Sequence, residues 1–146
     1  MMPAPAWQLR DPASGTPAPD LRQFEGKPLL LLFFHYTCLG CMGRALPLAR
    51  YYARHYPELQ LIGIHPDLGR QPLSDPELLA LAQEQQLAFP VYADPGAETY
   101  ARYEAGGTPH WVLIGPEGQI LNSIFGSMDD AQNRLYYSLL ELFGRE

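Results

Sequence analysis

Both cysteines of this 146-residue chain fall in one tetrapeptide, Cys38-Leu39-Gly40-Cys41, and a continuous apolar run from Leu29 to Phe34 stands just before it. An uninterrupted apolar segment of this length is typical of a strand that is buried on both faces of a sheet. Apolar residues then recur every three or four positions from Met42 to Tyr56, which predicts a helix with one buried face. The cysteine pair is therefore expected at the junction between a central strand and a helix.

A second apolar segment, Leu59 to Ile64, follows the predicted helix and predicts another strand. Strand, helix and strand in this order form a βαβ unit, so we expect residues 29–35 and 59–64 to pair in parallel. The length of the chain fits one domain of ordinary size. We therefore expect residues 1–146 to fold as a single α/β domain with a central sheet.

The rest of the sequence predicts shorter elements around this unit. Ser74 and Glu77 have the spacing of a capping box and Pro76 suits a first helical turn, so a helix is expected to run to about Gln86. In chain order, the other predicted elements are a short edge strand at 7–9, a loop at 11–19, a strand at 89–92, a short helix at 97–103, and an antiparallel hairpin of strands 111–114 and 119–125. Ser127 opens a last helix, whose predicted buried face carries Ala131, Leu135, Leu139 and either Leu142 or Phe143.

The position of the cysteine pair has chemical consequences. Free backbone N–H groups and the helix dipole at a helix N-terminus favour a thiolate, so Cys38 is the expected exposed nucleophile. Cys41 comes one helical turn later on the same side, where it can attack a mixed disulfide as the more buried resolving thiol. A stapling disulfide is disfavoured because closing a four-residue loop stabilises a fold little. A zinc site is disfavoured because the four histidines lack the paired spacing of zinc ligands.

The charge balance limits the partners. Sixteen acidic against ten basic side chains give a net charge of −6, which argues against nucleic acid or an anionic membrane surface as the main partner. The longest apolar run is too short for a transmembrane helix. Residues 1–10 lack a basic segment followed by an apolar one, as a signal peptide has. We therefore expect a cytoplasmic location, or a periplasmic or other extracytoplasmic one if the sequence lacks its export signal or anchor.

Four segments, in order, resemble the thioredoxin superfamily and, within it, the TlpA/ResA-like thiol-disulfide oxidoreductases, with DipZ-like domains as the nearest variants. They are Gly26-Lys27-Pro28 before the apolar strand, Tyr36-Thr37-Cys38-Leu39-Gly40-Cys41, Phe89-Pro90-Val91 with Asp94, and Gly107-Thr108-Pro109 before the hairpin. The resemblance spans about residues 5–143. It implies a thioredoxin-like fold, with a central mixed sheet flanked by helices, an N-terminal strand extension and an αβ insertion. It also implies an enzyme, a thiol-disulfide oxidoreductase with a redox-active CxxC.

The resemblance further implies the surroundings of the cysteines. Pro109 is expected in a cis peptide bond beside the CxxC, where the Thr108 backbone can pair with a bound peptide. His110 and Tyr36 complete the expected substrate-binding set. The implied partners are protein thiols or disulfides and an electron-donor redox protein. No cofactor and no metal are expected, and the chain is expected to act as a monomer.

The sequence departs from the family pattern next to the cysteines. Thr37 stands where many members have tryptophan, and Leu32 stands where thioredoxins carry a buried acid. The proton acceptor for the resolving thiol is therefore not assigned, and the candidates are Asp94, Glu98 and His35.

A second departure lies in the helix that follows. Pro47 comes six residues after Cys41, whereas the family's helix proline usually comes five after, as though one residue were inserted near Gly43. Because proline removes a helical hydrogen bond, a local bulge is expected there.

Other prominent side chains are interpreted as structural. These interpretations are His35 as a hydrogen-bonded residue at a strand end, His55 and His65 as surface or loop residues, Arg44 as part of a solvated helix face, Trp111 as core or rim, and Tyr51, Tyr52, Tyr56, Tyr136 and Tyr137 as packing between two helices.

Two other functions are open alternatives. A peroxiredoxin-like thiol peroxidase shares the fold, but its PxxxTxxC pattern is absent, because Thr37 abuts Cys38 and position 31 is leucine. A thioredoxin-fold copper-binding module is the second alternative, because soft thiolates select Cu(I). No cluster of methionine or histidine in the sequence completes such a site.

Overall fold

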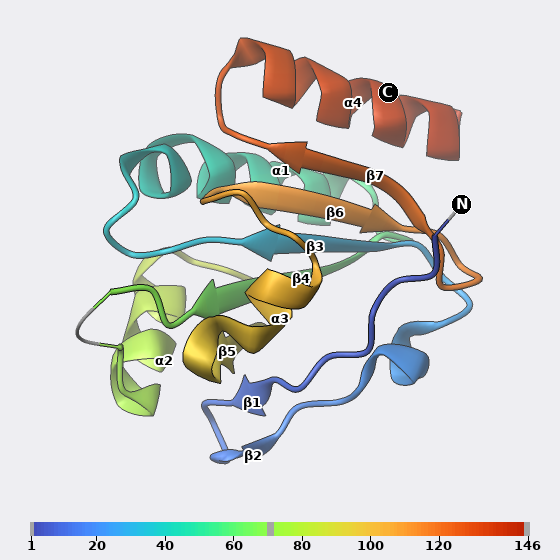
Figure 1. The fold of residues 1–146 in the computed structure, drawn as a ribbon. Helices are drawn as coiled ribbons and strands as arrows, with labels where there is room; N and C mark the ends of the chain where they lie inside the picture. The colour runs from blue at the N-terminus through green and yellow to red at the C-terminus, as the bar shows by residue number, and fades with distance from the viewer. Residues whose placement is uncertain (1, 70–71, 145–146) are drawn as a thin grey trace.

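The computed structural model describes residues 2–69 and 72–144 and places seven strands in one mixed sheet with helices on both faces (Figure 1). The strands are β1 (Arg10–Asp11), β2 (Thr16–Pro17), β3 (Leu29–Phe33), β4 (Gln60–Pro66), β5 (Val91–Asp94), β6 (His110–Ile114) and β7 (Ile120–Phe125), in the spatial order β2-β1-β5-β4-β3-β6-β7. The α-helices are α1 (Leu46–His55), α2 (Asp75–Glu84), α3 (Glu98–Arg102) and α4 (Asp129–Phe143). A π-helical turn, Cys41–Ala45, precedes α1, and 3-10 turns lie at Leu21–Phe24 and Pro95–Ala97.

The continuous apolar run forms the central strand β3, and all five of its side chains are buried. It pairs in parallel with β4 and antiparallel with β6, so that Leu31 lies between Ile62 and Val112. The β6–β7 pair is antiparallel. The thioredoxin-like mixed sheet and the parallel βαβ unit predicted from the sequence are therefore confirmed.

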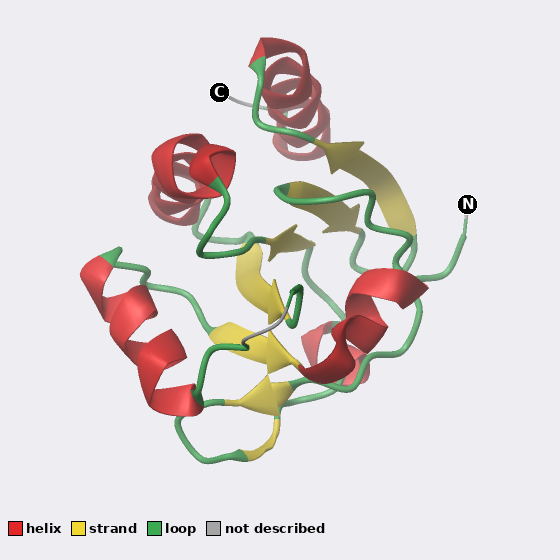
Figure 2. Cartoon of the chain, turned by 60° about the vertical axis from the view of Figure 1, so that its left-hand side comes forward, coloured by secondary structure: helices red, strands yellow, loops and turns green. Residues whose placement is uncertain are grey.

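Alternate side chains of the central strand enter two separate cores. The even-numbered side chains of residues 30–34 pack with α1, α2 and α4 on one face, together with Cys41. The odd-numbered side chains of residues 29–33 pack with the N-terminal segment and residues of α3 on the other face. Figure 2 shows the sheet between these helices. Apolar packing on both faces holds β3 in place, so the carboxyl end of the strand has a well-defined position for the segment that follows it.

Most predicted helices lie at the expected residues. Ser74 and Glu77 form the capping box at the start of α2, which ends two residues before the predicted end. In α4, Ala131, Leu135 and Leu139 are buried as predicted, and both Leu142 and Phe143 pack against the core. The helix begins at Asp129 rather than at Ser127, since Met128 is the extended capping residue. Within the described ranges, no helix is both long and apolar enough to cross a membrane.

The predicted N-terminal edge strand is displaced. The strand expected at 7–9 lies at Arg10–Asp11, and the expected loop at 11–19 contains its two-residue partner β2. Trp7 and Leu9 are buried in the second core, and the Trp7 indole donates to the Pro19 carbonyl. Prolines at positions 3, 5, 12, 17 and 19 supply no backbone N–H, which keeps the strand ladder short here. The strand predicted at 89–92 likewise begins only after Pro90, at Val91.

Candidate active site

The two cysteines lie at the carboxyl end of β3 and differ in exposure. Cys38 is partly exposed in the turn that follows the strand, and Cys41 is fully buried at the start of the π-helical turn. Both are free thiols in this structure. The expected order of an accessible first thiol and a buried second thiol is present in the geometry.

A loop from the other side of the sheet meets the first cysteine. The Thr108–Pro109 peptide bond that leads into β6 is cis, as the resemblance implied. The Cys38 thiol donates a hydrogen bond to the Thr108 carbonyl with Sγ and oxygen 3.3 Å apart. The Cys41 backbone N–H donates to Cys38 Sγ over 3.1 Å. Two segments 70 residues apart in the chain therefore converge on one sulfur atom.

The second thiol is held in its protonated form. Burial, followed by the hydrogen bond with Cys38, raises the pKa of Cys41 to about 12, against smaller opposing contributions from the His35 backbone and the Thr108 side chain. A thiol with this pKa is a poor nucleophile toward solvent-borne reagents at neutral pH. Cys41 is thus suited to react only with a sulfur that is placed next to it.

The bulge predicted near Gly43 is present. Residues Cys41–Ala45 form a π-helical turn, and the regular helix α1 begins directly after it at Leu46. The wider turn accommodates one additional residue, and Pro47 follows it as the second residue of α1. The extra residue relative to the family spacing therefore has a local structural solution.

Two histidines stack beside the cysteine turn. His35 and His65 are 5% and 2% exposed, and their ring centroids lie 4.6 Å apart in nearly parallel planes. The interpretation of His65 as a surface or loop residue is wrong, since His65 lies within β4, on the strand that neighbours β3. The pattern carried a signal that was missed. Both histidines stand near the carboxyl ends of adjacent parallel strands, where side chains meet at one edge of the sheet.

The stability of the fold is expected to depend on pH through His65. Burial, followed by the neighbouring His35, lowers the pKa of His65 from 6.5 to about 4. Between these two pKa values the unfolded chain binds more protons than the folded chain. The contribution of the neutral imidazole to the free energy of unfolding is therefore complete above about pH 6.5 and is lost as the pH falls toward 4. The complete pKa difference between the unfolded and folded chain corresponds to about 3 kcal/mol in the free energy of unfolding.

Denaturant titration from pH 7 to pH 4 measures this contribution. We expect the free energy of unfolding of wild type to fall more steeply than that of a His65→Gln variant, which has no titrating group at this position. The difference between the two proteins removes the contribution of carboxylates that titrate in the same range. Parallel curves for the two proteins would contradict a neutral, buried His65.

Exposed apolar side chains lie near Cys38; Tyr36 was expected at this site, whereas Leu39, Phe125 and Met128 were not. Leu39 is 88% exposed, and Tyr36, Phe125 and Met128 are also exposed. They belong to this site because Phe125 lies against Gly107 of the Thr108 loop, and Ser127 lies against Gly40 between the two cysteines. Apolar groups gathered on a surface are typical of a site that binds another molecule.

Several candidate site residues lie elsewhere or are engaged. His110, expected in the substrate groove, is buried, and its Nε2 pairs with the Ser123 hydroxyl. Burial lowers the pKa of His110. Asp94, a candidate proton acceptor, is fully buried at the end of β5, where its carboxylate accepts the backbone N–H groups of Thr99 and Tyr100. It therefore caps α3 and is committed to that helix.

Arg44 and Trp111 behave as interpreted, and the tyrosines do so in part. Arg44 is half-exposed and lies 3.8 Å from the exposed Asp129 carboxylate. Trp111 is buried in the core. Tyr56 stacks on Tyr52 of α1 and on Phe143 of α4, so these rings join the two helices, whereas Tyr51 and Tyr137 are exposed.

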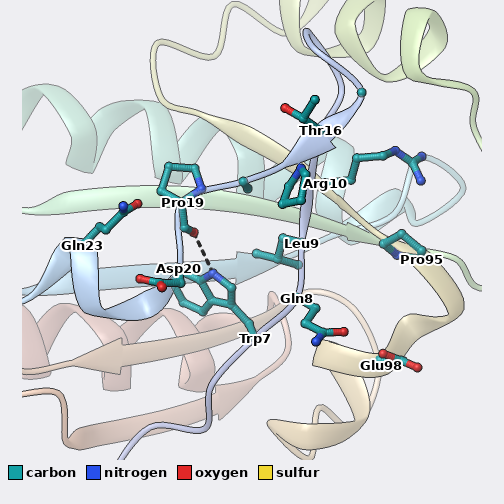
Figure 3. Close-up of a pocket in the computed structure, with 13 residues that line it drawn as sticks. Trp7, Gln8, Leu9, Arg10, Thr16, Pro19, Asp20, Gln23, Pro95 and Glu98 are labelled. Carbon is teal, nitrogen blue, oxygen red and sulfur yellow. Dashed lines mark hydrogen bonds between the residues drawn. The ribbon is translucent and has the colours of Figure 1, made fainter.

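One cavity lies near the N-terminal segment, away from the cysteines. It measures about 840 Å³ and is bounded by the N-terminal hairpin and the start of α3, including Trp7, Pro19, Asp20 and Glu98 (Figure 3). Glu98, a candidate proton acceptor for Cys41, lines this cavity. Among the described residues, no group of three or more histidine, cysteine, aspartate or glutamate side chains is arranged to hold a metal ion.

Comparisons with known proteins agree with this geometry. The sequence model of the AhpC/TSA family matches residues 2–123. A candidate DsbE-type thiol:disulfide interchange protein of Chlorobium tepidum superposes with a TM-score of 0.81 at 20% identity, covering 96% of this chain and 94% of its own. A thiol-disulfide isomerase of Corynebacterium glutamicum superposes with a TM-score of 0.74 at 25% identity, covering 94% and 96%. These matches confirm the resemblance to DsbE- and ResA-like proteins of thioredoxin fold.

A curated relative carries the similarity within a much longer protein. NHL repeat-containing protein 2 of Gallus gallus is 26% identical over 124 residues, which cover 83% of this chain. The matched region is 17% of the length of that protein.

Proposed function

The chain belongs to the AhpC/TSA family, and from that premise we propose that it is a thiol-disulfide oxidoreductase that exchanges disulfides with protein thiols. Cys38 is the nucleophile and Cys41 the resolving thiol. One observation carries this proposal: an accessible sulfur at a strand end accepts the backbone N–H of a buried second cysteine and touches the carbonyl that precedes a cis-proline. This arrangement offers one thiol to a partner and keeps the other in reserve.

The reaction proceeds in two exchanges. The Cys38 thiolate attacks one sulfur of a substrate disulfide, a new S–S bond forms to Cys38, and the other substrate sulfur leaves as a thiolate. Cys41 then attacks Cys38 Sγ, the second substrate sulfur leaves, and the Cys41 proton ends on one of the two released thiolates. The protein is left with a Cys38–Cys41 disulfide. A dithiol redox protein then reduces that disulfide by the same exchange run in reverse.

The surroundings of Cys38 suit an extended peptide with apolar side chains. The Thr108 backbone at the loop edge is a place where a peptide can pair as a strand. Leu39, Phe125, Met128 and Tyr36 supply exposed apolar area on either side of the sulfur. Burying such area against a bound chain removes apolar surface from water, which favours binding. The Thr108–Pro109 loop and Tyr36 are therefore proposed as substrate-binding, and His110 holds the loop through its Nδ1, which accepts the Gly106 backbone N–H over 3.5 Å.

Reduction of insulin by dithiothreitol tests this function. We expect the protein to shorten the lag before insulin precipitates, and to do so catalytically. The same preparation is assayed for consumption of hydrogen peroxide with a thioredoxin-type reducing system, and for Cu(I) binding against a chelator. Rapid peroxide turnover without insulin reduction would replace the proposal with the thiol peroxidase, and tight Cu(I) binding alone would replace it with the copper module.

A further inference from the structure

Two imidazoles hold the backbone that leads to Cys38. We propose that His35 and His65 are positioning residues. Their imidazole nitrogens accept hydrogen bonds from the Tyr36 and Thr37 backbone N–H groups, hold this backbone in place, and thereby set the reactivity of the Cys38 sulfur. The inference rests on the proposed function for its biological meaning, but it concerns the chemistry of one thiol and can be tested without a substrate.

His65 reaches the turn from the neighbouring strand. Its Nε2 accepts the Tyr36 backbone N–H with the two nitrogens 3.2 Å apart. Acceptance at Nε2 requires a lone pair there, so the proton of the neutral ring is on Nδ1. A buried backbone N–H without a partner is costly, so this bond fixes where the chain leaves β3.

His35 holds the next residue from within the turn. Its Nδ1 lies 3.3 Å from the Thr37 backbone nitrogen, which donates to it, and 2.8 Å from the Thr37 hydroxyl. The His35 carbonyl accepts the Cys38 backbone N–H over 3.1 Å. A single residue therefore binds both the residue before the nucleophile and the nucleophile itself.

The two rings support one another and the turn. His35 and His65 stack on each other, and the Tyr36 ring lies against His35 with centroids 4.8 Å apart.

Both rings act in their neutral form. A protonated imidazole has no acceptor nitrogen, so charging either ring would break the bond to the Tyr36 or Thr37 backbone. Burial lowers the pKa of His35, against the Leu68 backbone and the charge of Asp67, which follows β4. Burial and the neighbouring His35 both lower the pKa of His65, to about 4.

The link to the nucleophile is geometric. Cys38 Sγ must lie both 3.1 Å from the Cys41 backbone nitrogen and within reach of the Thr108 carbonyl. These contacts hold the sulfur where a backbone N–H stabilises a thiolate. If the Tyr36–Thr37 backbone rotates, the sulfur moves away from that donor. We therefore expect a slower reaction of Cys38 when either acceptor is moved.

Matched amide substitutions test the position of each acceptor. The glutamine side chain places an oxygen near the site of Nε2, and asparagine places it near the site of Nδ1. His65→Gln and His35→Asn therefore keep the acceptor, while His65→Asn and His35→Gln move it by one bond. All four variants carry a neutral amide, so loss of packing is similar within each pair. The rate of Cys38 alkylation by iodoacetamide at pH 7 is measured on the full chain by peptide mass mapping.

We expect the acceptor-keeping variants to react within about threefold of wild type, and the acceptor-moving variants to react about tenfold more slowly. Equal rates within each matched pair would overturn the proposal, even if melting temperatures fall in both members. Failure of the insulin assay with wild type would instead overturn the proposed function and leave this test standing.

Discussion

Replacing Cys38 with serine is expected to abolish catalysis of insulin reduction, with a loss of about 10³-fold or more. A serine oxygen cannot form the mixed disulfide, and the remaining Cys41 thiol is buried and has its pKa raised to about 12. The fold should be retained, because Cys38 is partly exposed and a serine hydroxyl can still donate to the Thr108 carbonyl.

Leu39→Ser is the matched control for this variant. The substitution lies next to Cys38, changes the most exposed apolar side chain of the site, and leaves both thiols in place. We expect it to retain turnover, with a raised KM for insulin. Cys38→Ser protein that still reduces insulin at the control rate would show that Cys38 is not the nucleophile.

Replacing Cys41 with alanine is expected to stop the reaction halfway. The first exchange needs only Cys38, but without a resolving thiol the substrate stays bound to Cys38 through a disulfide. Turnover should fall by about 10²-fold or more, and a covalent adduct should accumulate on a large share of the protein. Alanine is chosen because Cys41 is fully buried within the apolar core, where a methyl group adds no polar atom.

The adduct is measured by non-reducing electrophoresis and mass spectrometry after mixing with a protein disulfide. The reciprocal Cys38→Ser protein serves as the control and should form no adduct, because its one thiol is buried. Adducts on both variants in equal amounts would contradict the division of roles between the two cysteines.

The core of the fold could be predicted because one strong pattern sets it. An uninterrupted apolar run admits few placements other than a strand buried on both faces, and Leu29–Phe33 is that strand. The CxxC that follows and the helical spacing after it then fix the βαβ unit. The extra residue before Pro47 predicted a bulge, and the π-helical turn at Cys41–Ala45 confirms it. In each case a local rule and the tertiary structure agree.

The parts that could not be predicted depend on contacts between distant segments. Trp7 and Leu9 pack into the second core, and the residues they meet there lie far along the chain, so their burial is set by tertiary contacts. The parallel pairing of β3 and β4 places His65 near His35, but the stacking of the two rings depends on tertiary packing. The exposed apolar surface around Cys38 includes Phe125, which the topology brings there from the end of β7.

An equilibrium redox titration of the wild-type chain in glutathione buffers tests most directly whether Cys38 and Cys41 form one redox couple. Each state is trapped by alkylation and its mass is measured by mass spectrometry. We expect two species only: a dithiol that carries two alkyl groups after trapping, and a form that carries none, in which Cys38 and Cys41 are joined by a disulfide. We also expect that their ratio follows a two-electron couple, in which about 30 mV changes it tenfold. A protein that carries glutathione on Cys38 while Cys41 stays free throughout, or that is never oxidised, would contradict the claim that these cysteines form one redox couple.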